Sequence, residues 1–321
     1  MDRILITAIF VGIPTLAYAK LVNNIDRFEK EPTLYLIGAF LWGALPAAIA
    51  ALILQLILEI PVAAFFGTES IGGQLVSTAV NAPVTEEIFK GCAVAIIYFT
   101  RRQEFDGWVD GLVYGAMAGF GFAYVENIVY LVNLTNNWGD WTSLYFFRVI
   151  IFGFMHGFWT ALTGIGFGLA RNMGNPIAKV TVIAGGLTLA ILGHLIHNGA
   201  IVLMQRNSAT VFVALGNYSF LALVMISLSV WAAHHERKIL QIYLQDEVPE
   251  IISAEDYASL CSRRNNALAR FRFAPKQQRA FIQAAAELAQ KKLQLMRMGE
   301  EGGNSAEIVR LRTVLKELKS T

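Results

Sequence analysis

Seven apolar stretches, each long enough to cross a lipid bilayer, most strongly limit what this chain can fold into. A transmembrane helix needs about 20 predominantly apolar residues. Only 16% of the 321 residues are charged, whereas soluble domains carry about 25%. The sequence therefore predicts an all-α, polytopic helical membrane protein with about seven transmembrane helices. The expected helices cover residues 4–19, 33–66, 75–99, 108–132, 144–170, 180–204 and 210–233.

The first two stretches differ from a simple span. The second, 33–66, is overlong and contains Pro46 and Pro61, so we expect it to be kinked, tilted or broken. The first ends at residues 17–20 in the sequence AYAK, which resembles a signal-peptidase site. It is therefore either a true helix or a cleaved leader, and the charges of the loops distinguish these two cases.

Lysine and arginine gather in alternate loops. One set of loops holds almost all of them, and the other holds only Arg3 and Arg206. The positive-inside rule places the basic loops in the cytoplasm, which puts the N-terminus outside and the C-terminal tail inside. Because cleavage after residue 19 would reverse this orientation, we interpret 4–19 as a true helix. The basic set is Lys20, Arg27, Lys30, Arg101, Arg102, Arg171, Lys179, Arg237 and Lys238.

The charge pattern divides the chain into a transmembrane core, residues 1–233, and a cytoplasmic helical tail, residues 234–321. In the tail, Ser253 and Asn304 begin sequences that resemble capping boxes. Pro275 is expected to open a helix that ends near Met298, before Gly299. The simplest interpretation of the tail is a solvated helical hairpin without chemistry. The alternatives are that it binds a cytoplasmic partner or dimerises.

Two carboxylates and a lysine interrupt the third apolar stretch. A charge at the bilayer centre costs about 2.5–3.5 kcal/mol on insertion scales, and such residues mark functional sites. On a helix, Glu86 lies four residues and Glu87 three residues before Lys90, so both can pair with the lysine. The cluster is therefore either an internally neutralised structural group or the centre of a catalytic or ion-handling site.

Further polar residues in the next three helices are expected at a similar depth. Glu86, His156 and His194 each lie ten to twelve residues from the outer end of their helices, which places them ~15–18 Å below the outer surface. Glu126 is slightly shallower. This agreement in depth predicts a single site. On the same faces lie Phe122 and Tyr130, four residues either side of Glu126, and Asn198, four residues after His194.

Other membrane polar residues have simpler interpretations. His197 is expected to be a hydrogen-bond partner between helices, and Arg148 is expected to reach the outer membrane interface. Asp106 and Asp110 flank the start of the fourth helix and are interpreted as boundary residues.

The residue types suit hydrolysis in two ways that spacing does not separate. A buried carboxylate can act as a general base on water, while His194 and Asn198 donate hydrogen bonds to the oxyanion of a tetrahedral intermediate. Alternatively, histidines and a carboxylate can bind zinc, although the HExxH motif is absent. The candidate zinc ligands are His156, His194 and Glu126.

These residues resemble the motifs of the PrsW family of intramembrane proteases. Residues 86–90 are similar to its EExxK motif, residues 122–130 to its FxxxExxxY pattern, and His156 and His194 to its two histidine motifs. The family is distantly similar to the type II CAAX prenyl endopeptidases. That similarity implies that Glu86 activates water and that His194 and Asn198 form the oxyanion pair.

The sequence differs from the CAAX relatives at two motif positions, and the resemblance to the PrsW family implies where a substrate is cleaved. Glu126 stands where the CAAX relatives have histidine, and Lys90 stands one position before their arginine, which argues against prenylated substrates. The resemblance implies cleavage of a membrane-anchored substrate, such as an anti-sigma-factor-like protein, near the outer face of a bacterial cell membrane. The expected partners are this substrate and the bilayer, without nucleic acid.

Two other functions use the same residues. Carboxylates and histidines also form proton relays in transporters and channels, but paired interrupted helices in two symmetric halves are not evident in the sequence. A catalytically inert scaffold that binds partners through its tail is the third hypothesis.

Overall fold

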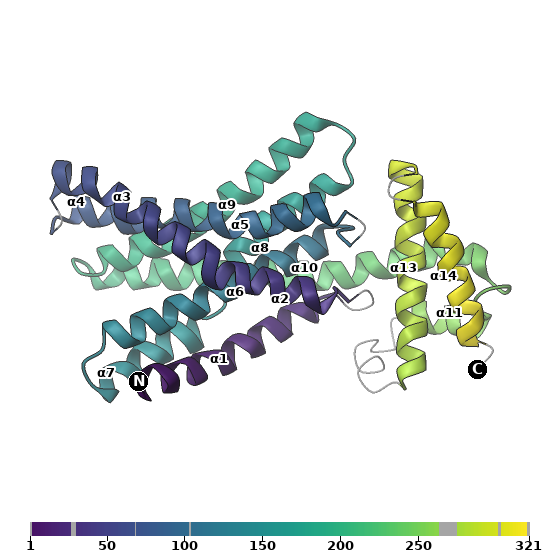
Figure 1. Cartoon of the computed structure of the whole chain (residues 1–321), viewed down its shortest axis with the longest axis horizontal. Helices are drawn as coiled ribbons and strands as arrows, with labels where there is room; N and C mark the ends of the chain where they lie inside the picture. The colour runs from purple at the N-terminus through teal and green to yellow at the C-terminus, as the bar shows by residue number, and fades with distance from the viewer. Residues whose placement is uncertain are drawn as a thin grey trace.

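The computed structural model describes residues 2–26, 30–67, 69–102, 104–262, 275–300 and 303–319. These residues form helices and the turns between them, with no β-strand in the described ranges. Helices α1 to α10 form an elongated bundle, and α11, α13 and α14 form a separate group at one end of it (Figure 1). The predicted all-α architecture is confirmed.

Six helical stretches of the described chain are long and apolar enough to cross a membrane, and they correspond to six of the seven expected spans. The remaining expected span, residues 75–99, contains α5 (Ala82–Thr100). This helix carries Glu86, Glu87 and Lys90 and is therefore less apolar. The six are Arg3–Asn23, Thr33–Phe66, Trp108–Asn133, Trp138–Arg171, Pro176–Leu203 and Ser208–Tyr243. The chain is an integral membrane protein.

Several of these stretches contain π-helical turns. α2 (Thr33–Trp42) and α3 (Ala48–Phe66) are joined by the π-helical residues Gly43–Ala47, which include Pro46. A proline cannot donate the backbone hydrogen bond of a regular helix, which accounts for the π-helical turn, and the stretch Thr33–Phe66 stays helical throughout. Before α5, a short α4 (Ile71–Gln74) leads into a second π-helical turn, Leu75–Asn81.

The span expected at 144–170 lies within Trp138–Arg171, but it is not one regular helix, because the chain divides there into three parts. They are α7 (Trp138–Tyr145), the π-helical segment η3 (Phe146–Ile151) and α8 (Met155–Arg171), with a turn between η3 and α8. His156 therefore lies in the first turn of α8. π-Helical segments of this kind are common at functional sites.

The centre of the bundle is formed by α6 (Trp108–Asn133) and α8, which pack against each other through glycines. A methyl group added at Gly164 would lie 1.8 Å from the carbonyl oxygen of Gly111, and one at Gly111 would lie 2.0 Å from that of Gly164. Only glycine allows backbones to approach this closely. At the other end of the contact, Gly119 lies against the backbone of His156, so the same packing fixes the start of α8.

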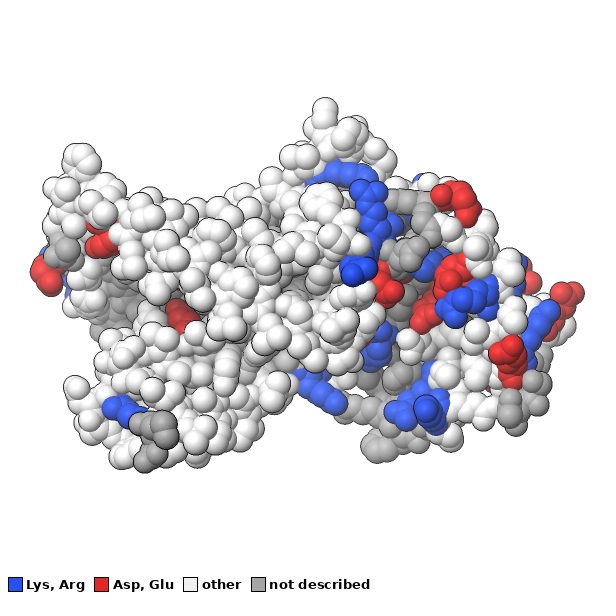
Figure 2. Space-filling view, viewed as in Figure 1, with Lys and Arg blue, Asp and Glu red and all other residues white. Residues whose placement is uncertain are grey.

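The remaining bundle helices cover this centre. α1 (Asp2–Asn23) lies against α6, and α9 (Pro176–Leu203) lies against α8. α10 (Val211–Tyr243) packs on α9 and continues as one helix into the terminal group of helices. Figure 2 shows that Lys, Arg, Asp and Glu gather over this terminal group, while the bundle surface in that view is largely uncharged.

The tail helices begin where the sequence predicted. Ser253 caps α11 (Ala254–Cys261), Pro275 precedes α13 (Lys276–Met298), and α14 (Asn304–Lys319) follows. Their apolar faces form a second core with the end of α10, which includes Leu240, Leu288 and Leu311. This core is separate from that of the bundle, and α10 runs through both without a break.

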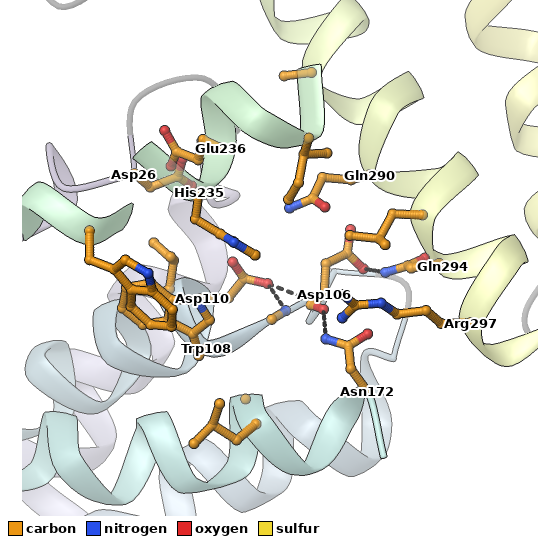
Figure 3. Close-up of a pocket in the computed structure, with 18 of the residues that line it drawn as sticks. Asp26, Asp106, Trp108, Asp110, Asn172, His235, Glu236, Gln290, Gln294 and Arg297 are labelled. Atoms are coloured by element: carbon orange, nitrogen blue, oxygen red, sulfur yellow. Dashed lines mark hydrogen bonds between the residues drawn. The ribbon is translucent and has the colours of Figure 1, made fainter. Parts of the chain in front are cut away.

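A polar contact joins the tail to the bundle beside a cavity of about 300 Å³ (Figure 3). The carboxylate of Asp106, just before α6, accepts hydrogen bonds from Lys291 (3.1 Å) and Gln294 of α13. Asp110 accepts a hydrogen bond from the Gly107 amide (2.9 Å) and so caps the start of α6. The predicted boundary residues therefore hold the tail and the first turn of α6.

Candidate active site

Four helices bring the five predicted intramembrane Glu and His residues to one place in the bundle. Glu86 and Glu87 come from α5, Glu126 from α6, His156 from α8 and His194 from α9. The first two glutamates are buried, and Glu87 is completely inaccessible. The carboxylates of Glu86 and Glu87 therefore depend on their protein neighbours for hydrogen bonds.

Glu87 is fully engaged by hydrogen-bond donors. Its Oε1 accepts from the Lys90 ammonium at 2.6 Å and lies 3.0 Å from His194 Nδ1. Its Oε2 accepts from the Thr160 hydroxyl at 2.9 Å. Both oxygens thus have partners, and the side chains of Glu87 and Lys90 are each 0% exposed. This pair forms the internally neutralised group that the sequence allowed.

Glu86 differs from its neighbour because one of its oxygens has no hydrogen-bond partner. Oε1 accepts from Gln55 of α3 at 3.3 Å. Oε2 is buried without a hydrogen bond, and the Lys90 ammonium lies 3.6 Å away. A buried carboxylate oxygen without a donor is unfavourable unless a ligand, a water or a proton occupies the adjacent space. Of the two adjacent glutamates, Glu86 is therefore the one that can bind a reacting group.

Both histidines turn one ring nitrogen to a carboxylate and the other toward Glu86. His194 Nδ1 faces Glu87, and His156 Nε2 lies 2.9 Å from Glu126 Oε2. If these nitrogens carry the protons, as the hydrogen-bond network assigns, the remaining nitrogens are acceptors. His194 Nε2 lies 3.9 Å and His156 Nδ1 4.0 Å from Glu86 Oε2. Three acceptor atoms thus surround one small space.

This group of three has the chemistry of a metal site. Two imidazole nitrogens and one carboxylate oxygen are a known zinc ligand set, and the three atoms lie within 4.8 Å of one another. Histidine ligands normally donate their other ring N–H to a carboxylate, as His156 and His194 do here. Ligand atoms on one tetrahedral zinc ion are about 3.3 Å apart, so side-chain rotations would close the group. Lys90 Nζ, now 3.1 Å from His156 Nδ1, would have to release that nitrogen.

Glu126 lies outside this group of three and contacts the ring nitrogen of His156 that points away from Glu86. Its Oε2 accepts from Arg148 Nη2 at 2.8 Å as well as facing the histidine. Phe122 lies one turn earlier on α6, with its ring 5.5 Å from the His156 ring and 4.4 Å from Lys90 Nζ. Glu126 is therefore placed to orient His156, whereas Glu86 takes the third place in the possible ligand group.

Asn198 does not join the group. Its side-chain amide donates to the Thr78 carbonyl at 2.9 Å, and this bond ties α9 to the π-helical turn before α5. His197 packs against the ring of Phe152 at 5.2 Å, and its Nδ1 has no hydrogen-bond partner. Neither residue contacts the carboxylates of the site in the described structure.

Four further residues contact the site but were not predicted to do so. Gln55 and Thr160 donate to the two glutamates, and the Trp159 ring stacks on His194 at 3.9 Å. Arg148 contacts Glu126 at 2.8 Å, a contact that was not expected from the sequence. The signal available in the sequence was polarity, because Gln55 and Arg148 are isolated polar residues in apolar stretches.

The accessible side of the site is the one that carries Arg148. The exposed fraction of the side chains falls from 27% at Arg148 through 21% at Glu126 and 12% at His156 to 7% at Glu86. The exposure of the group therefore increases toward the Arg148–Glu126 pair.

Comparisons with known proteins identify the family of the chain. The family described as PrsW family intramembrane metalloprotease matches residues 31–231, which cover α2 to most of α10. A Protease PrsW of Oceanobacillus iheyensis is 28% identical over 199 residues, or 62% of this chain and 82% of that protein. Those of Clostridioides difficile and Bacillus subtilis are 30% and 29% identical over 125 and 133 residues.

These matches differ in extent. They span 50% of the C. difficile protein and 55% of the B. subtilis protein, and 39% and 41% of this chain. No solved structure matches the chain significantly. The family match extends over well more than half of the sequence and contains every residue of the site described above. The chain belongs to the PrsW family of intramembrane metalloproteases.

Proposed function

We propose that this protein is an intramembrane endopeptidase in which Glu86 activates the water that attacks a peptide bond. The observation that carries the proposal is the unpartnered Glu86 Oε2, which faces His156 Nδ1 and His194 Nε2 across one buried space. Three acceptors around a space of this size favour a bound water, which can donate to two of them. Glu87 is a poor candidate base because both of its oxygens already accept hydrogen bonds.

The hydrolysis needs no covalent intermediate. Glu86 takes a proton from the water as its oxygen bonds to the substrate carbonyl carbon. His194 Nε2, 3.9 Å from Glu86 Oε2, is placed to carry this proton to the leaving nitrogen when the C–N bond breaks. Glu87 holds the His194 ring in position through Nδ1, and Lys90 keeps Glu87 ionised. Asn198 is not used as an oxyanion donor, since its amide bonds the Thr78 carbonyl.

A divalent metal ion, which the family description implies, fits the same three atoms. Glu86, His156 and His194 would hold it, and zinc would supply Lewis-acid activation of the water. In either case Glu87 and Glu126 orient the two histidines. The ligand set differs from the candidates His156, His194 and Glu126 in that Glu86 replaces Glu126.

The proposed substrate is a membrane-anchored protein such as an anti-sigma-factor-like protein. The buried position of the site within the bundle supports a substrate that reaches it from the bilayer. The charge asymmetry of the loops supports an orientation in a bacterial cell membrane with the N-terminus outside and the tail in the cytoplasm.

The test is the cleavage of a co-expressed membrane-anchored reporter by Glu86→Gln. This variant should lose cleavage and keep the wild-type thermal stability. The matched control is Glu59→Gln, because Glu59 is a membrane glutamate on α3 whose carboxylate accepts from Ser77 away from the site. Undiminished cleavage by Glu86→Gln contradicts the proposal. Proton flux in proteoliposomes, without any cleavage, would favour the transporter hypothesis instead.

Metal analysis of the purified protein forms the second part of the test. A metal-dependent enzyme would contain about one zinc ion per chain, bound by three protein ligands as in catalytic zinc sites, and would lose the ion in His194→Asn; Glu86 would then be a ligand and not the free base. Wild-type protein that cleaves its reporter while free of metal would show that Glu86 activates water without an ion.

A further inference from the structure

We infer that Arg148 is a positioning residue that fixes the orientation and tautomer of His156 through Glu126. The inference rests on the proposed function, in which His156 turns its Nδ1 to the reacting water. It starts from the two contacts of one oxygen atom. Glu126 Oε2 lies 2.8 Å from Arg148 Nη2 and 2.9 Å from His156 Nε2.

Arg148 is held to α6 by three contacts. In addition to Glu126, its Nε donates to the Asn127 amide oxygen at 3.1 Å, and its guanidinium lies 3.8 Å from the centre of the Tyr130 ring. Only a guanidinium offers two fixed N–H directions together with a flat face for stacking. The three partners occupy positions i, i+1 and i+4 of one helix, so they hold the arginine in a single orientation.

The location of Arg148 explains why such an anchor is needed. Arg148 lies in η3, and a non-helical turn separates η3 from α8, where His156 occupies the first turn. No continuous helix therefore fixes the direction of the imidazole from the η3 side. The Arg148–Glu126–His156 chain of contacts joins η3, α6 and α8 across this break.

The electrostatic consequence concerns which ring nitrogen carries the proton. An ionised Glu126 accepts a hydrogen bond, so it favours the His156 tautomer with the proton on Nε2. That tautomer leaves a lone pair on Nδ1, the atom that faces Glu86 Oε2 and Lys90 Nζ. Without Arg148, Glu126 can turn toward other donors, and the other tautomer becomes accessible.

The experiment compares Arg148→Gln with wild type in the full chain in detergent. The spectra are recorded after treatment with a chelator, and kcat is measured on untreated protein. The ¹⁵N spectra of the histidine side chains report the tautomer directly, and the His156 signals are assigned by their loss in His156→Asn. In wild type we expect a proton on Nε2 and none on Nδ1. In Arg148→Gln we expect signals of both tautomers and a kcat for reporter cleavage about 10–100-fold lower, as for other partners of this kind, with KM unchanged.

Two further variants separate positioning from folding. Arg148→Lys restores a positive charge beside Glu126 and should recover part of kcat and of the Nε2–H signal. Arg3→Gln is the matched control, because Arg3 ties α1 to α6 through the Leu131 carbonyl at 3.3 Å, without contacting the site. It should change neither the tautomer nor kcat.

The outcomes distinguish this inference from the proposed function. A single Nε2–H tautomer and a wild-type kcat in Arg148→Gln would overturn the role of Arg148, even if Glu86→Gln abolishes cleavage. Cleavage that survives Glu86→Gln would overturn the proposed function, while the spectra would still decide whether Arg148 sets the tautomer of His156.

Discussion

Replacement of Lys90 by methionine is expected to destabilise the protein strongly, because it leaves Glu87 buried without its cation. The ammonium lies 2.6 Å from Glu87 Oε1, and both side chains are 0% exposed. Removal of one partner from a buried ion pair costs about 3–5 kcal/mol. Glu87 would keep its contacts with His194 and Thr160, so we expect the lower end of this range, about 3 kcal/mol.

The measurement is the free energy of unfolding in mixed micelles, followed by circular dichroism as the denaturing detergent is increased. A loss of 3 kcal/mol corresponds to a roughly 150-fold smaller folding constant. The double variant Glu87→Gln/Lys90→Met removes both charges and should be more stable than Lys90→Met alone, since no uncompensated charge remains. Lys20→Met, at an exposed lysine in the last turn of α1, is the control.

Two outcomes would refute this reasoning. The first is a free energy of unfolding of Lys90→Met within about 0.5 kcal/mol of the wild-type value, which is the typical effect of a surface substitution. Glu87 and Lys90 would then not form a buried ion pair in the folded protein. If the double variant is no more stable than the single one, the loss comes from packing around the lysine and not from the unpaired carboxylate.

Two other predictions concern packing and the tail. Gly164→Ala should destabilise the bundle by about 1–3 kcal/mol and lower cleavage, because its methyl group would meet the Gly111 carbonyl at 1.8 Å. Gly185→Ala, with open space around it, is the control. Equal free energies of unfolding for the two variants would contradict this prediction. Burial raises the pKa of Glu247, but hydrogen bonds from Arg312 and Lys292 outweigh burial and lower it. A carboxylate whose pKa is lower in the folded than in the unfolded protein stabilises the folded state at pH values above its unfolded-state pKa. The protection of the tail amides from hydrogen exchange should therefore fall as the pH drops below about 4.5. Glu247→Gln should be less protected at neutral pH and nearly independent of pH, and a wild-type-like pH response in this variant would exclude Glu247 as the cause.

The features that could be predicted from the sequence are those with local or periodic signals. Apolar length predicted the membrane helices, and Pro275 and Gly299 predicted the limits of α13. Charged residues in apolar segments indicated Glu86, Glu87 and Lys90, because their energetic cost inside a bilayer needs compensation. These signals depend on neighbours in the chain, so they can be recognised without knowledge of the tertiary structure.

The features that could not be predicted depend on contacts between helices. The break before His156 falls at Phe152, Gly153 and Phe154, which read as a continuous apolar helix. The i,i+4 spacing of His194 and Asn198 puts them on one face, but a π-helical turn brings the Thr78 carbonyl to Asn198. Spacing along a helix therefore limits which residues can share a site, while the partners from other helices decide which of them do.

The uninterrupted length of α10 has a mechanical consequence. Its 33 residues extend about 50 Å, whereas the hydrocarbon core of a bilayer is about 30 Å thick. The end of this rod therefore projects from the membrane and forms part of the tail core through Ile239 and Leu240. Because α10 enters the tail core without a break, the position of the tail helices depends on the tilt of this one helix in the bilayer.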